Sequence, residues 1–119
     1  PRDLHAHACI TFEGLMSPAE WRFRNGKAEL SVAIRSRLVV NTAEAAIDAA
    51  ATGLGVTRVL SYQIADALRA RTLEIILDEF EPDPSPVNLV YAGQGLLPIK
   101  TRAFVDFSTE RLRRKLEAD

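Results

Sequence analysis

The chain is poor in cysteine and has no long apolar segment. Its 119 residues include one cysteine, Cys9, so no disulfide can form within the chain. A single free cysteine is typical of a reducing compartment. No apolar run reaches the roughly 20 residues that a membrane-spanning helix needs, and no signal-peptide pattern opens the chain. We therefore expect a cytoplasmic protein that has no contact with a membrane.

An excess of charge of one sign is also lacking. Lys and Arg total 15 against 16 for Asp and Glu, which leaves a formal net charge of −1. The chain as a whole is therefore not a binder of polyanions. A basic cluster near the end of the chain is interpreted as the solvated end of a last helix, with nucleic-acid contact as the alternative. Its members are Arg111, Arg113, Arg114 and Lys115.

The motifs of common enzymes are absent from the sequence. It has no Gly-x-Ser-x-Gly nucleophile elbow and no phosphate-binding loop. The pair Gly53 and Gly55 is too short for a dinucleotide-binding fingerprint, and it follows a helical pattern instead of opening one. The sequence therefore predicts no enzymatic activity and no cofactor.

His5, His7 and Cys9 fall at alternate positions and raise the question of a metal. On a strand they would point to one face, and all three are residue types that bind zinc. The chain has no other His or Cys, so a fourth protein ligand would have to be a carboxylate. We expect no metal here, with a zinc enzyme as the alternative.

The most informative stretch is residues 37–62. Residues 38–40 are apolar and typical of a buried strand, and residues 54–60 form a second apolar run of strand length. Between them Asn41 is the expected helix N-cap, with Glu44 completing a capping box, and Gly53 is the expected left-handed residue after the helix. Helical spacing gives this helix one apolar face, formed by Ala43, Ala46, Ile47, Ala50 and Ala51.

This arrangement places the N-terminus of a helix just past the end of a strand. Unpaired backbone N–H groups and the positive end of the helix dipole gather there and attract carboxylates and phosphates. In open α/β sheets, ligands bind outside the carboxyl ends of the strands. The alternative interpretation is that Asn41 and Thr42 only cap the helix.

The remaining pattern predicts a lobe that contains both hairpins and helices. Residues 8–12 are expected to be a buried strand and residues 14–18 a loop. Asn25-Gly26 predicts a hairpin that sets Trp21 and Phe23 against the apolar face of a returning strand, and residues 35–37 are expected to break the pattern. That face is formed by Leu30, Val32 and Ile34.

The second half of the chain continues the alternation. Ser61 is expected to cap a short helix, and residues 72–77 and 87–91 are expected strands that flank a Pro-rich loop at 81–86. After a loop at 93–98, Pro98 is expected to begin a helix of about 16–18 residues. Its apolar stripe is formed by Phe104, Val105, Phe107, Leu112 and Leu116. Together these elements predict an α/β lobe with a mixed sheet.

Several long segments resemble the effector-binding domain of LysR-type bacterial transcriptional regulators. The segment LVVNTAEAAIDAAATGLGVTRVLSYQIAD is similar to the second lobe of that domain, and NLVYAGQGLLPIKTRAFVDFSTERL is similar to its closing strand and terminal helix. DLHAHACITF and WRFRNGKAELSVAIRSRLVVN resemble the run into the second lobe. The resemblance covers nearly the whole chain.

The resemblance implies a fold and a domain division. The expected fold is α/β, a periplasmic-binding-protein-like lobe, with a return strand and terminal helix that belong to the partner lobe. Residues 1–86 would be the second lobe and residues 87–119 the return segment of the first. The chain would then be a fragment, and DNA would be contacted only through an N-terminal winged helix-turn-helix absent from it.

The resemblance also implies a function. A small-molecule effector, with anions among the candidates, would bind between the two lobes and modulate transcription in a homo-oligomer. The effector-binding residues implied are Asn41, Thr42, Ala43, Thr57 and Ser61, with less support for Arg58. One lobe of a transporter solute-binding protein, which shares the fold, is the alternative.

Overall fold

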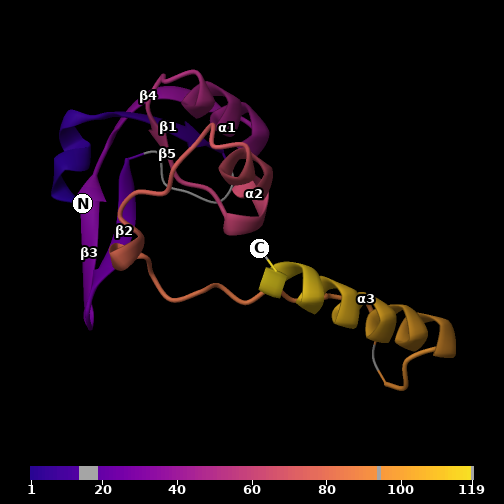
Figure 1. The fold of residues 1–119 in the computed structure, drawn as a ribbon. Helices are drawn as coiled ribbons and strands as arrows, with labels where there is room; N and C mark the ends of the chain where they lie inside the picture. The colour runs from indigo at the N-terminus through magenta and orange to yellow at the C-terminus, as the bar shows by residue number, and fades with distance from the viewer. Residues whose placement is uncertain (14–18, 94, 119) are drawn as a thin grey trace. The chain divides into compact units, whose positions relative to one another are not determined.

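A computed structural model describes residues 1–13, 19–93 and 95–118. The chain divides into two compact units, residues 1–83 and residues 84–119, and each is described by itself (Figure 1). The loop expected at residues 14–18 lies outside the described residues.

The first unit is built around a three-stranded parallel sheet. Strand β1 (Ala8–Phe12) lies between β4 (Arg35–Val40) and β5 (Val56–Thr57), and it runs parallel to both. Cys9 and Ile10 are fully buried, as expected for a central strand that is covered on both faces. Because the strands are parallel, their carboxyl ends meet at one edge of the sheet.

The expected break at residues 35–37 is wrong, because β4 begins at Arg35. Arg35 pairs with Ala8, and the register shifts between Cys9 and Ile10, so that Cys9 pairs with Ser36 and Ile10 with Leu38. This bulge gives β4 one extra residue, and the side chains of Arg35 and Arg37 remain exposed. Charged residues therefore fit an edge strand without interrupting it.

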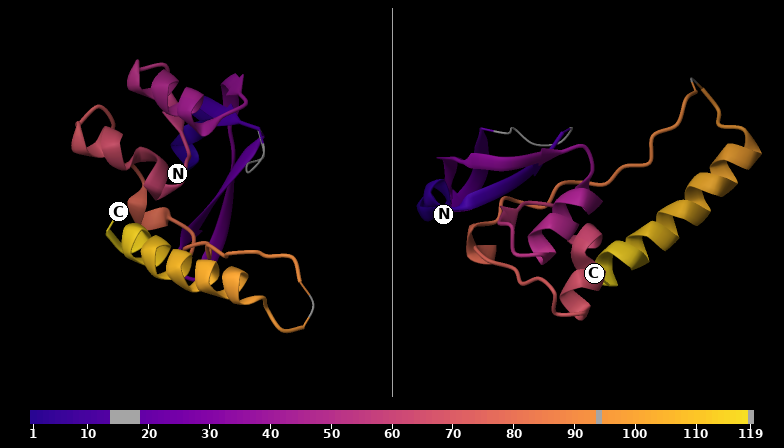
Figure 2. Two further views of the ribbon diagram at one scale, coloured as in Figure 1. Left: turned by 90° about the vertical axis from the view of Figure 1, so that its right-hand side faces the viewer. Right: turned by 90° about the horizontal axis from the view of Figure 1, so that it is seen from above.

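Helix α1 (Ala43–Ala51) links β4 to β5 and covers one face of the sheet (Figures 1 and 2). Ala43 and Ala46 are buried against Ile10 and Phe12 of β1, where small side chains allow helix and sheet to approach closely. The helix ends as expected at Gly53, whose φ is +82°. The Gly53 N–H donates to the Ala50 carbonyl at 2.9 Å and the Leu54 N–H to that of Ala49 at 3.2 Å, which is a Schellman motif.

A hairpin covers the opposite face of the sheet. Strands β2 (Glu20–Asn25) and β3 (Ala28–Ala33) are antiparallel, and Trp21 pairs with Val32 and Phe23 with Leu30 as the alternation predicts. Asn25 pairs with Ala28, so the two turn residues are Gly26 and Lys27, one position later than expected. Gly26 has a φ of +61°, which the first turn residue of a type II′ hairpin requires. The core on this side is formed by Leu4, Cys9, Trp21, Phe23, Val32 and Ile34.

The parallel strands and the antiparallel hairpin thus form separate sheets of one α/β lobe. Helix α1 covers one face of the parallel sheet, and the hairpin covers the other. Helix α2 (Ser61–Arg69) lies next to α1. The apolar run 54–60 forms a strand only at Val56–Thr57.

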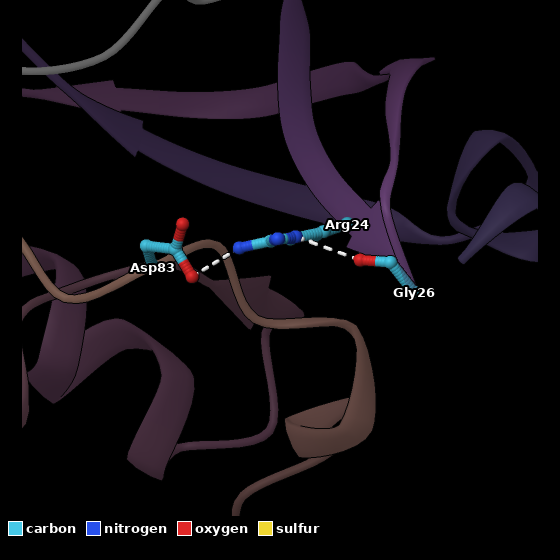
Figure 3. A network of polar contacts seen from close by, with 3 residues as sticks. All are labelled: Arg24, Gly26 and Asp83. Atoms are coloured by element: carbon cyan, nitrogen blue, oxygen red, sulfur yellow. Dashed lines mark hydrogen bonds and ion pairs between the residues drawn. The ribbon is translucent and has the colours of Figure 1, made fainter.

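The expected strand at residues 72–77 does not form among the described residues. Leu77 has a left-handed φ of +61°, and a short 3₁₀ helix, η2 (Asp78–Phe80), follows. Beyond it, Asp83 forms an ion pair with Arg24 of β2 (Figure 3). The Nε of Arg24 also donates to the Gly26 carbonyl at 2.7 Å. The end of the first unit is thereby fastened to the tip of the hairpin.

The second unit contains one long helix, α3 (Ile99–Ala118), which follows Pro98 as expected but has 20 residues. The strand expected at residues 87–91 is absent from the described residues. A strand needs a neighbour for its backbone hydrogen bonds, and the described residues of this unit provide none. Among the described residues, no helix combines the length and apolar character that crossing a membrane requires.

Several large apolar side chains of the second unit face solvent. Val90 is 93 % exposed, and on α3 Phe104 is 67 % exposed and Phe107 57 %. Val105 and Leu116 of the expected stripe are half-buried. Because isolated domains rarely expose so many large apolar groups together, this unit carries a surface that is suited to packing against other protein.

Candidate functional site

The candidate site is the edge of the parallel sheet where β1, β4 and β5 end. Residues 41–43 follow β4, and Thr57 is the last residue of β5. β1 lies between them in the strand order, and Thr57 pairs with Ile10 whereas Val40 pairs with Phe12, so the two groups lie on different strands and at different levels along the sheet.

Thr42, and not Asn41, caps helix α1. Thr42 has an extended backbone, and its Oγ1 accepts a hydrogen bond from the Ala45 N–H at 3.2 Å. The expected capping box with Glu44 is wrong, because a helix that begins at Ala43 puts Ala45 at the third position. Asn41 is exposed and lies outside the helix.

The first turn of α1 presents open backbone donors. Ala45 donates to the Thr42 side chain and Ala46 to the Thr42 carbonyl at 3.3 Å. The N–H groups of Ala43 and Glu44 precede the first intrahelical bond and have no partner within the described residues. The Ala43 side chain is buried, which fixes the position of these donors relative to the sheet. The Thr42 hydroxyl keeps its proton for a further acceptor.

Thr57 is already engaged in the structure. Its Oγ1 donates to the Ile10 carbonyl at 3.0 Å, a bond that joins β5 to β1 beyond the ladder. The hydroxyl oxygen can still accept a hydrogen bond but has no second proton to donate. Thr57 can therefore contact a donor group of a small molecule and cannot bind an anion through its hydroxyl while this bond persists.

Ser61 is the first residue of α2, and it does not cap the helix as expected. The N-cap is Leu60, whose N–H donates to the Gln63 Oε1 at 2.9 Å. The Ser61 hydroxyl is exposed and forms no hydrogen bond within the described residues, so it is open to a small molecule.

Arg58 follows β5 directly and is half-buried. Its guanidinium carbon lies 5.8 Å from the centroid of the Phe23 ring. Burial lowers the pKa of the Arg58 guanidinium, and the nearby charge of Glu81 acts in the opposite direction. In sequence, Arg58 is the single charged residue of the apolar run 54–60. A charge in such a run indicates a side chain that contacts another part of the fold, here the Phe23 ring.

The alternative of a zinc site would need His5, His7 and Cys9 on one face of a strand, and the structure does not place them so. His5 belongs to a 3₁₀ helix, η1 (Arg2–Ala6), so His5, His7 and Cys9 do not share one strand. Both imidazoles are exposed, whereas Cys9 is fully buried and burial raises the pKa of its thiol. Throughout the described ranges, no three His, Cys, Asp or Glu side chains cluster as metal ligands would.

The basic cluster of α3 is exposed, as expected for the solvated end of a helix. Arg114 forms an ion pair with Glu110 at 2.8 Å, and the Arg111 guanidinium lies 4.3 Å from the Phe107 ring centroid. These contacts are along one helix and stabilise it locally.

Comparisons with known proteins agree on one family. The family model described as the LysR substrate binding domain matches residues 1–113. The probable HTH-type transcriptional regulator LtrA of Klebsiella pneumoniae is 31 % identical over 114 residues, which cover 92 % of this chain and 37 % of LtrA. The HTH-type regulator PtxR of Pseudomonas aeruginosa is 25 % identical over 115 residues, with coverage of 97 % and 37 %.

Solved structures that resemble the chain include regulatory domains of one transcription regulator. The regulatory domain of AphB from Vibrio vulnificus is 25 % identical with a TM-score of 0.72, and the match covers 93 % of this chain and 56 % of that domain. The C227S variant of the same domain gives 26 % identity and a TM-score of 0.72, with coverage of 90 % and 55 %. The chain thus spans about a third of the length of the curated relatives and about half of the solved domains.

Proposed function

The chain belongs to the LysR substrate-binding domain family, and from this premise we propose that it senses a small-molecule effector for a bacterial LysR-type DNA-binding regulator. Its fold is the α/β, periplasmic-binding-protein-like fold of that family. The effector binds between two lobes and modulates transcription. DNA is contacted through an N-terminal winged helix-turn-helix outside this chain.

The open first turn of α1 carries the proposal. The backbone N–H groups of Ala43 and Glu44 and the Thr42 hydroxyl all belong to the start of α1, which follows the end of β4. The positive end of the helix dipole favours a negative charge there. An anionic metabolite bonded to Ala43 and Thr42, with Asn41 and Ser61 at the rim and Thr57 as an acceptor, matches these groups.

The division between lobes is part of the proposal. Residues 1–86 form the second lobe, and residues 87–119 return to the first lobe. Support comes from the exposed apolar side chains of the second unit and from the limited coverage of the AphB domain. The missing part of the first lobe would provide the partner strand for residues 87–91 and the surface against which α3 packs.

Binding acts through lobe closure. An effector that contacts both lobes binds the closed arrangement more tightly than the open one, and this difference in affinity shifts the population. In a homo-oligomer, closure changes the spacing of the DNA-binding domains. No catalytic step is involved, the protein needs no cofactor, and it works in the cytoplasm.

A metabolite library tested on the intact regulator examines this function. We expect at least one small molecule, most readily a carboxylate or phosphate, to raise the melting temperature and to change transcription from a reporter promoter. Thr42→Val should weaken the apparent affinity for this molecule about tenfold, as measured both by the melting temperature and by the reporter. The reason is that the hydroxyl donor and the helix cap are lost together.

Thr42→Ser retains the hydroxyl and should bind nearly as well as the parent protein. If both variants respond as the parent does, Thr42 does not belong to the site. If the library yields molecules that bind but leave transcription unchanged, effector sensing is wrong.

A further inference from the structure

The first unit ends in a segment that is fastened to the hairpin side of the fold. This exit segment, residues 77–83, contains the short helix η2. Leu77 and Phe80 pack against the core under the hairpin, and Asp83 forms an ion pair with Arg24 of β2 (Figure 3). Asp83 is also the last residue of the first unit, so the chain leaves this unit directly from the ion pair.

A second contact holds the Arg24 guanidinium in position. Its Nε donates to the Gly26 carbonyl at 2.7 Å, while a terminal nitrogen of the same planar group donates to Asp83. Because the bond to Gly26 already restricts the guanidinium, less side-chain entropy is lost when the ion pair forms. The Asp83 side chain is 82 % exposed, so water can replace Arg24 and the pair can open.

The chain around and beyond Asp83 is stiff. Pro82, Pro84 and Pro86 alternate with Asp83 and Ser85, and each proline fixes its own φ and restricts the residue before it. A proline-rich linker is extended and semi-rigid, whereas a glycine-rich linker of equal length is a flexible coil. A stiff segment keeps the direction in which it starts, so an anchor at Asp83 restricts the path of residues 84–86.

We propose that the Arg24–Asp83 ion pair is a releasable anchor for the connection between the lobes, and that it sets how readily they close on the effector. The inference rests on the proposed function and deepens it, since it names a residue pair that controls closure without contacting the effector. Both residues belong to the first unit, so closure can proceed with the pair intact. Release of the pair adds open arrangements that compete with the closed one, which lowers the apparent affinity.

Hydrogen–deuterium exchange of the 119-residue chain, followed by NMR, tests the anchor itself. The N–H groups of Phe80 and Glu81 donate to carbonyls within the exit segment at 3.0 Å and 3.1 Å, so their exchange reports on its order. We expect Arg24→Gln and Asp83→Asn each to speed this exchange about three- to fivefold, the upper end of what an exposed ion pair contributes. The double variant should equal either single variant, because all three lose the same pair.

Two controls separate the anchor from a general loss of stability. Arg22 lies on the same strand, is exposed and forms no ion pair within the described residues, so Arg22→Gln should leave the exchange unchanged. Trp21 is the only tryptophan of the chain and is buried in the hairpin, so its fluorescence shows whether each variant keeps the hairpin folded.

Spin labels test the effect of the anchor on the connection without any ligand. Asp48 of α1 and Arg113 of α3 are exposed and can be replaced by cysteine for labelling, while the buried Cys9 is protected. The distance distribution between the two labels should broaden in Arg24→Gln and keep its parental width in Arg22→Gln. Replacing Pro84 and Pro86 together by glycine should broaden it as well, with unchanged exchange in the exit segment.

The intact regulator then tests closure. Arg24→Gln and Asp83→Asn should each weaken the apparent affinity for the library metabolite that most raises the melting temperature, about three- to fivefold, with the same maximal reporter response. Parental exchange at Phe80 and Glu81 in both variants would overturn the proposal, as would parental affinity in the intact regulator. A parent regulator whose transcription responds to no metabolite rejects the proposed function, and the role in closure with it.

Discussion

Gly55 lies against the backbone of Ala8, so that a Cβ on Gly55 would be 2.3 Å from the Ala8 carbonyl oxygen. This contact is where β5 joins β1. The close approach leaves no room for any side chain, because the atom in the way belongs to the backbone of a buried strand.

Gly55→Ala should therefore destabilise the chain by about 2–3 kcal/mol, since the strands must separate to admit one methyl group. Gly53→Ala is the matched control. Gly53 has open space around it, and only its φ of +82° is unfavourable for alanine, at a cost of about 1 kcal/mol. Urea unfolding of both variants measures the difference. Equal losses would mean that β5 does not approach β1 this closely.

The cap at Thr42 is a second testable relationship. Thr42→Val removes the acceptor for the Ala45 N–H and should lower the free energy of unfolding by about 1 kcal/mol. Asn41→Ala should change it by less than about 0.5 kcal/mol, because Asn41 caps nothing in α1. Chemical denaturation checks both, and the reverse order would restore Asn41 as the cap.

Cys9 should make stability depend on alkaline pH. Burial raises the pKa of its thiol in the folded state, so the folded chain favours the neutral form. The contribution of Cys9 to the free energy of unfolding is therefore fully present below the thiol pKa of the unfolded chain, about 8.5. It is lost as the pH rises through the thiol pKa of the folded chain. The stability advantage of the parent chain over Cys9→Ala should shrink above that pH. An advantage that stays constant between neutral and alkaline pH would contradict this assignment.

The exposed face of α3 should be buried in the intact regulator. Phe107→Asp should cost about 2–3 kcal/mol there, because an aromatic side chain is removed from an interface. In the 119-residue chain the same substitution should cost less than about 0.5 kcal/mol, since Phe107 is 57 % exposed. Arg113→Asp, an exposed site on the same helix, should be mild in both proteins. A large effect in the short chain alone would place the Phe107 partner within these residues.

Local patterns predicted much of this fold. Alternating apolar residues identified the hairpin pairs Trp21–Val32 and Phe23–Leu30, and Gly53 identified the end of α1. These features depend on neighbours in sequence or on one pair of strands, so the sequence contains most of the information.

The failures share a physical cause. Residues 87–91 have the composition of a strand, but a strand forms only where a partner supplies hydrogen bonds. The starts of α1 and α2 were each misplaced, because several residues near each start can provide a capping oxygen and tertiary packing decides among them. Thr42 caps α1 in place of Asn41. At the start of α2, the Gln63 side chain accepts the Leu60 N–H, where Ser61 was expected to cap the helix.

Arg58 shows what the sequence conceals at the site. Its position after β5 follows from the sequence pattern, but its contact with Phe23 and the nearby charge of Glu81 depend on how the hairpin and residues 78–83 fold over the sheet. Asn41, Thr42, Ala43, Thr57 and Ser61 remain predictions as binding residues.

Hydrogen–deuterium exchange of the intact regulator, with and without the metabolite that most stabilises it, tests the central claim most directly. We predict slower exchange in peptides that contain residues 41–45 and 57–61, because the amides at the start of α1 and the end of β5 become bonded or shielded. Unchanged exchange in both regions, with protection elsewhere, would show that the effector does not bind at the carboxyl edge of this sheet.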